Sequence, residues 1–140
     1  MRQAEIIQAC YTRLNVSAVT SLLSTGYGIP AIFQAGRVPR NDAGDPAFFP
    51  YITFSLPSDV EMDTNAELGG NAIVQIDAWV RSGSAVSVGN LTRAIALATV
   101  RQAWTVPGFI TCERESTDIT IDPDGLTMHG MVRVRVMYRD

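Results

Sequence analysis

Apolar and polar residues alternate along several stretches of this chain, most clearly in VQIDAWV at residues 74–80. One side of the alternation holds Val74, Ile76, Ala78 and Val80, and the other side holds Gln75, Asp77 and Trp79. A period of two is typical of a β-strand with one buried face. The pattern predicts a strand over residues 71–81 whose polar face meets water or another subunit.

Two longer segments show helical spacing instead. Residues 3–14 place Ile6, Ile7, Cys10 and Leu14 on one face, which predicts an amphipathic helix. Residues 84–103 predict a second helix, capped by Ser84, with two apolar stripes: Val88, Leu91, Ile95 and Ala98, then Ala94, Leu97, Arg101 and Trp104. We expect one stripe to meet a sheet and the other to meet a second helix or a neighbouring chain.

Four more strands are predicted, at residues 31–34, 51–56, 109–121 and 126–139, and a short helix is expected in VSAVTSLLS at 16–24. The last two strands flank DPDG at 122–125, a strong turn signal, and so form a long hairpin.

The charges of that hairpin predict its register. Placing Cys112 opposite Val134 joins two apolar residues and sets Glu113 opposite Arg133. Ile119 is then out of phase with the apolar face, so we expect a bulge near 116–118.

These elements predict an α+β fold, with a mostly antiparallel sheet and two main helices packed on one face. The length suits a single domain over 1–140. The opposite sheet face would carry polar, charged and aromatic side chains.

Composition narrows the range of partners. The net charge is −3 and all eleven basic residues are arginines, so nothing predicts an electrostatic grip on nucleic acid or membrane. The absence of lysine excludes a Walker phosphate lysine and a Schiff-base lysine. It reflects either a GC-rich genome or a use of arginine at interfaces. No apolar run approaches the ~20 residues of a membrane span, and the first residues, MRQAEIIQAC, show no signal-peptide h-region, so we expect synthesis and folding in a cytoplasm.

Candidate chemistry is sparse, and we expect no enzyme, metal or cofactor. Glu113 and Glu115 share a strand face, but nearby arginines favour ion pairs over acid catalysis. The single histidine, His129, lacks a neighbouring nucleophile motif, and Cys10 and Cys112 are expected to be buried thiols. The acidic run Asp59, Glu61, Asp63 and Glu67 is either a solvated connector, a distorted hairpin or a cation site.

Interface-prone residue types gather on the predicted outer sheet face instead. Trp79, Met131 and Met137 stand there among the arginines, and protein interfaces are enriched in these types. The pattern favours an assembly surface over a catalytic one.

The order of motifs supports this interpretation. PYITF at 50–54 opens a strand, an acidic segment ends in LGG at 68–70, and QIDAWV at 75–80 precedes a long helix. Over residues 1–105 this order resembles the tail completion or tail terminator proteins of long-tailed bacteriophages and gene transfer agents.

The resemblance implies a structural virion protein of the tail or neck, assembled in the host cytoplasm. Members of that family form a ring, commonly a hexamer, at the head-proximal end of the tail tube. The ring stops tube polymerisation and joins the head connector, while DNA passes through its pore without specific binding. The family implies a homo-oligomer with tail tube and connector partners, and no catalytic residues.

Two surfaces are candidate interfaces on this interpretation. Asp59, Glu61 and Asp63 are expected to face the pore or the tube, because their uniform negative charge does not hold phosphates. A second set is placed in or beside the subunit contact: Trp79, Glu113, Glu115, Arg133 and Arg135. The alternatives are another neck protein, such as a connector or stopper, a non-viral α+β ligand-binding module, and, with least support, an enzyme.

Overall fold

The structure is a computed structural model that describes residues 2–63, 68–81 and 85–139, with the backbone alone for 59–63 and 68. Its helices are α1 (Gln3–Leu14), α2 (Ser17–Thr20) and α3 (Ala85–Thr99). Its strands are β1 (Ile32–Gln34), β2 (Tyr51–Asp63), β3 (Leu68–Arg81), β4 (Phe109–Ile121) and β5 (Thr127–Arg139).

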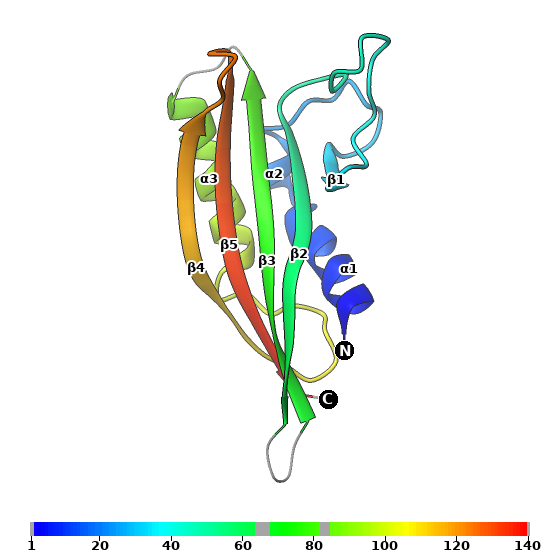
Figure 1. Cartoon of the computed structure of the whole chain (residues 1–140), viewed down its shortest axis with the longest axis vertical. Helices are drawn as coiled ribbons and strands as arrows, with labels where there is room; N and C mark the ends of the chain where they lie inside the picture. The colour runs from blue at the N-terminus through cyan, green and yellow to red at the C-terminus, as the bar shows by residue number, and fades with distance from the viewer. Residues whose placement is uncertain (1, 64–67, 82–84, 140) are drawn as a thin grey trace.

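The described strands form one sheet in the order β1-β2-β3-β5-β4. Every pairing is antiparallel except that of the short edge strand β1 with β2, which is parallel. Figure 1 shows the helices together on one face of this sheet, which leaves the other face open. The predicted α+β fold, with two main helices on one side of a mostly antiparallel sheet, is confirmed.

The core lies between the helices and the inner face of β2, β3 and β5. Alternate residues of β3 and β5 are buried there, as the period of two predicts, including Val74, Ile76, Val132 and Val134. They pack against Ile6, Cys10, Leu14, Val88, Leu91 and Ile95 of the helices. Burial of each such aliphatic side chain contributes about 1.5–3 kcal/mol to the stability of the fold. The alternate apolar residues of the strands therefore hold the sheet and the helices together.

Helix α3 ends four residues earlier than predicted. Arg101 adopts a left-handed backbone with φ of 57°, and its N–H donates to the carbonyl of Cys112 in β4 at 2.7 Å. The chain therefore leaves the helix to meet the sheet, and Trp104 is buried in the core rather than on a second helical stripe. Leu97, which the same stripe contained, is 64% exposed. The predicted cap Ser84 lies outside the described residues.

A glycine of β5 lets α3 approach the sheet closely. A Cβ at Gly130 would lie 2.2 Å from Thr92 Oγ1 and 3.2 Å from Val88 Cγ2. Both of these atoms belong to the buried face of α3, so a side chain at position 130 would push helix and sheet apart.

Strand β2 extends seven residues beyond its predicted end at 56, and β3 begins three residues before its predicted start at 71. They remain paired out to Asp63 and Leu68, with one register shift between Ser55 and Ser58. Pro57 lies within that shift, where a missing N–H leaves no ladder bond unmade. The backbone of Asp59, Glu61 and Asp63 is therefore part of a distorted antiparallel pair of strands, in line with one of the alternatives that the sequence leaves open, and Glu67 lies outside the described residues. The backbone of residues 59–63 and its partner residues 68–72 form what we call the β2–β3 arm, at the lower end of the sheet in Figure 1.

The register predicted for the last hairpin is wrong by two residues. Cys112 lies opposite Val136, and Glu113 lies opposite Arg135. A slip of two preserves which residues face the core, so the alternation of residues does not distinguish the two registers. A register shift between Arg114 and Ser116 lies next to the expected bulge.

Candidate assembly surfaces

The centre of the open sheet face carries a connected cluster of polar and aromatic side chains. We call it the outer-face cluster, and it consists of Thr53, Gln75, Asp77, Trp79, His129 and Arg133. Pairing places Trp79 opposite His129 and Gln75 opposite Arg133, and Thr53 opposite Asp77. Three strands therefore contribute to one surface, and each residue comes from an outward position of its strand.

Stacking and a hydrogen bond hold Trp79 in this cluster. Its ring lies 4.0 Å from that of His129 and nearly parallel to it, at 4°. Its indole N–H donates to Thr53 Oγ1 at 3.0 Å, and the Tyr51 ring stacks nearby, with the two ring centroids 6.2 Å apart. Trp79 is partly buried by these neighbours, so it presents a fixed aromatic surface rather than a free side chain.

Asp77 connects the polar members of the cluster. His129 Nε2 lies 2.6 Å from Asp77 Oδ1, and the Gln75 amide donates to Asp77 Oδ1 at 3.2 Å. Gln75 Oε1 in turn accepts two bonds from Arg133, at 3.0 and 2.7 Å. Asp77 is only 7% exposed. It lies on the outer sheet face together with Trp79, as the alternation of residues predicts, and its contacts with Gln75 and His129 shield it from water.

The charged residues of the hairpin pair differently from the prediction. Arg135 forms an ion pair with Glu115, and Glu113 pairs with Arg101 at 3.3 Å. Arg133 pairs with Gln75 instead of Glu113 because the register differs by two residues. These pairs are partly exposed, and such pairs contribute roughly 0–1 kcal/mol each, so they fix orientation more than stability.

The acids of the β2–β3 arm alternate with apolar residues along β2. Asp59, Glu61 and Asp63 occupy alternate backbone positions opposite Ala72, Gly70 and Leu68. Val60 and Met62 occupy the positions between them, opposite Asn71 and Gly69. The side chains at 59–63 lie outside the described residues, as does Glu67.

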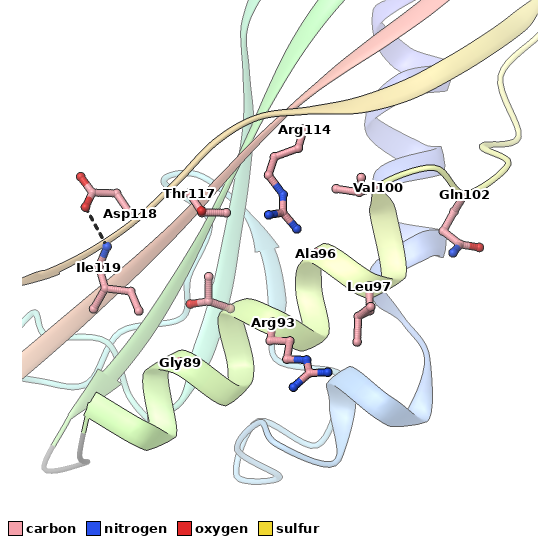
Figure 2. Close-up of a pocket in the computed structure, with 11 residues that line it drawn as sticks. Gly89, Arg93, Ala96, Leu97, Val100, Gln102, Arg114, Thr117, Asp118 and Ile119 are labelled. Carbon is pink, nitrogen blue, oxygen red and sulfur yellow. Dashed lines mark hydrogen bonds between the residues drawn. The ribbon is translucent and has the colours of Figure 1, made fainter.

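Two grooves lie at opposite edges of the sheet. The α3–β4 groove has a volume of about 610 Å³, and Figure 2 shows its wall of α3 facing its wall of β4. Its lining includes Arg93, Ala96, Leu97, Arg114, Thr117 and Ile119. The α1–β1 groove has about 670 Å³ and is lined by Ile7, Tyr11, Ile32, Phe33, Arg37 and Phe54, among others. Both are open troughs with apolar walls rather than enclosed catalytic clefts.

The titratable groups give little support to chemistry. Burial raises the pKa of the Cys112 thiol to about 12, and burial likewise raises that of Cys10. Thiols of this kind are protonated and poor nucleophiles near neutral pH. Over the described ranges, no three His, Cys, Asp or Glu side chains gather as a metal site. None of the described helices has the length and apolar character needed to cross a membrane.

The sequence profile of one protein family, described as tail completion protein gp17, matches residues 13–139. The chain belongs to the tail completion protein gp17 family. The resemblance seen in PYITF, LGG and QIDAWV is therefore confirmed, and the match extends through the C-terminal hairpin that those motifs do not reach.

Solved structures share the fold of this tail completion family member. A chain of the virion of a native gene transfer agent particle aligns with a TM-score of 0.82 at 12% identity, covering 99% of this chain and 98% of that one. The gp17 protein of bacteriophage SPP1 aligns with a TM-score of 0.58 at 14% identity, covering 96% and 88%. No curated protein matches in sequence.

The α3–β4 groove is the surface of this tail completion protein that the sequence did not predict. Ile119 and Ile121 fall out of phase with the apolar face, and this was a usable signal. The register shift between Arg114 and Ser116 does bring them to the side of the sheet that Cys112 faces, but both lie on the edge strand β4, where they are 44% and 65% exposed. Exposed aliphatics beside a groove mark a contact surface more often than a core.

Proposed function

We propose that this protein forms a ring at the head-proximal end of a phage-like tail tube, where it stops tube polymerisation and joins the head connector. The observation that carries the proposal is the family match over residues 13–139. The near-complete alignment with a chain of a gene transfer agent virion supports a place in the tail or neck. Assembly would take place in the host cytoplasm.

The two edges of the sheet support a ring over a dimer. The edges differ: one carries β4 and α3, and the other carries β1 and the upper part of β2. A contact between unlike surfaces repeats from copy to copy, and it closes into a ring when the rotation allows. We propose a homohexamer built by the single domain 1–140.

The interfaces of this ring involve two groups of residues. The first group lies on the β2–β3 arm: Asp59, Glu61 and Asp63. The second lies on the open sheet face: Trp79, Glu113, Glu115, Arg133 and Arg135. The rigid stacking of Trp79 supports its role, because an aromatic side chain already held in place loses little entropy when a partner covers it.

The DNA would pass through the pore without specific binding. The net charge of −3 supports this, because a surface without excess positive charge does not release counterions from phosphates. The role needs neither a cofactor nor a catalytic residue, and we propose that the protein is not an enzyme.

Removing the gene from the genome that encodes it tests the proposal. We expect electron microscopy to show headless tails of uncontrolled length, and native mass spectrometry of the purified protein to show a ring. Tails of normal length that fail to join heads would instead indicate a connector or stopper. Unchanged infectious particles would refute both roles.

A further inference from the structure

We propose that the α3–β4 groove of one copy receives the β2–β3 arm of the next copy. This inference rests on the proposed ring and names the two surfaces that would build it. It departs from the expectation that the acidic run faces the pore or the tube.

The groove exposes apolar side chains that the monomer leaves in water. Leu97 of α3 and Ile119 of β4 line it from its two sides, and both are exposed. Ile121 continues the same row on β4. Exposed aliphatic side chains in one hollow are typical of a surface that a partner covers.

The charge of the groove is positive. Arg93 and Arg114 line it, and within the described part of the chain neither has an ion-pair partner or a hydrogen bond. Figure 2 shows the Arg114 side chain reaching from β4 toward α3. The one acid of the lining, Asp118, turns its carboxylate to its neighbour's backbone, where it accepts the Ile119 N–H at 2.9 Å. Its lining therefore carries two arginines and one carboxylate, and neither arginine pairs with that carboxylate.

The arm has the complementary composition. Its β2 strand reads Asp59-Val-Glu-Met-Asp63, in which acids alternate with the apolar residues Val60 and Met62. No basic residue interrupts positions 57–70. A segment that combines acids with apolar residues suits a trough with aliphatic walls and two arginines, because both the apolar surface and the charges would then be covered.

Sheet topology requires the contact to join two copies. The strand β2 and the groove strand β4 lie toward opposite edges, separated by β3 and β5. Three strand spacings of about 4.8 Å separate them within one molecule, and Figure 1 shows the arm pointing away along the strands. The arm and the groove are unlike surfaces, so their contact can repeat from copy to copy, and it closes into a ring when the rotation between copies allows it.

Disulfide trapping between two different variants tests the contact. We expect Asp63→Cys protein mixed with Leu97→Cys protein to give a cross-linked heterodimer under mild oxidation. Asp63→Cys mixed with Ala18→Cys, an exposed position on α2, is the matched control. The native Cys10 and Cys112 are fully buried and stay in place. A heterodimer yield no higher than that of the control would overturn the inference.

Charge reversal gives an independent test. We expect the double variant Arg93→Glu, Arg114→Glu to weaken self-association about 100-fold or more, since like charges would face each other. Glu61→Arg with Asp63→Arg should do the same, and the four changes together should restore association. The double variant Arg93→Lys, Arg114→Lys, which keeps the charge, is the control, and circular dichroism checks folding.

The outcomes separate this inference from the proposed function. If native rings form and neither reversal weakens them, the arm does not occupy the groove, although the ring stands. In that case arm variants that alter tail length or DNA delivery would place the acids at the tube or the pore. If deletion of the gene leaves tails normal, the function itself is wrong, whatever the cross-links show.

Discussion

Asp77 illustrates how single residues on an open sheet face can behave like core residues. Its carboxylate contacts His129 and Gln75, and the residue is buried. A buried group of this kind is stabilising only while its partners are present, because unpaired polar atoms lose their hydration without compensation. The outer-face cluster is thus one cooperative unit around Trp79.

Replacing Asp77 with Ala should therefore destabilise the protein by about 1–3 kcal/mol, since the partner groups of Gln75 and His129 would be left partly buried and unbonded. Urea unfolding followed by tryptophan fluorescence measures this. The matched control is Asp118→Ala on the exposed strand β4, which should change stability by no more than about 0.5 kcal/mol. Equal effects of the two changes would mean that the cluster contributes nothing.

The buried thiols make stability depend on pH in the alkaline range. Burial raises the pKa of Cys112 from 9.0 to about 12 and also raises that of Cys10. Below pH 9 the thiols are protonated in both states. Above it the unfolded thiols ionise first, so the free energy of unfolding should fall by up to about 1.4 kcal/mol per pH unit for each thiol.

Denaturant titrations between pH 8 and 11 measure that slope. The variant Cys112→Ala removes one thiol, so its stability should fall less steeply with pH than that of the native protein, whatever its stability at pH 8. Parallel slopes for the two proteins would contradict the burial of this thiol.

At the scale of an element, two glycines near helix α3 differ in the space around them. Gly89 lies within the helix with no atom within 4 Å of a built Cβ, whereas a Cβ at Gly130 would meet Thr92 of the same helix. Space is available at the first position and absent at the second. Gly89, a residue of low helix propensity, therefore has room for a larger side chain. Gly130 in β5 does not, because α3 packs directly against it.

The same substitution should consequently act with opposite signs. Gly89→Ala should stabilise the protein by about 0.5–1 kcal/mol through helix propensity. Gly130→Ala should destabilise it by about 1–3 kcal/mol through overpacking. Thermal unfolding by circular dichroism measures both.

A second-site change checks the cause of the Gly130→Ala effect. Adding Thr92→Ala should recover part of the loss, because the Thr92 hydroxyl is the nearest obstacle. No recovery of stability would mean that Thr92 of α3 does not limit the size of the side chain at position 130.

At the scale of the whole molecule, the open sheet face presents charged groups that are already held in place. Arg133 and Arg135 present guanidinium groups that are held by Gln75 and Glu115. Their positions are thus set before a partner arrives, which reduces the entropy lost on binding. This fixed position of the two arginine side chains favours the proposed subunit contact.

Reversing the charge at position 133 tests the contact. Arg133→Glu should shift the native mass from ring to monomer and disturb tail length, because an acid would replace a positioned cation at the interface. Arg133→Gln, which loses the charge without reversing it, should have a smaller effect. If Arg133→Glu left both oligomer mass and tail length unaltered, the contact would lie elsewhere.

The sequence predicts features that depend on neighbouring residues better than features that depend on contacts between distant segments. The limits of α1 and the two faces of β5 were predicted well, since they follow from periodicity within a dozen residues. The end of α3 was not, because the Arg101 N–H bonds to Cys112 in another element. The candidate pair Glu113–Arg133 also failed, since a slip of two residues leaves the alternation of faces unchanged.

The amino-acid sequence alone determined the α+β layers, the family resemblance and the interface-prone composition of the outer face. These depend on local period and on residue type, and folding does not alter either. Only the tertiary structure decided the partners of Asp77 and the pairing of Glu115 with Arg135. It likewise placed Arg93 and Arg114 in the lining of one groove. Each of these depends on which distant segments the buried core brings together, and the core allows several registers that a linear pattern does not distinguish.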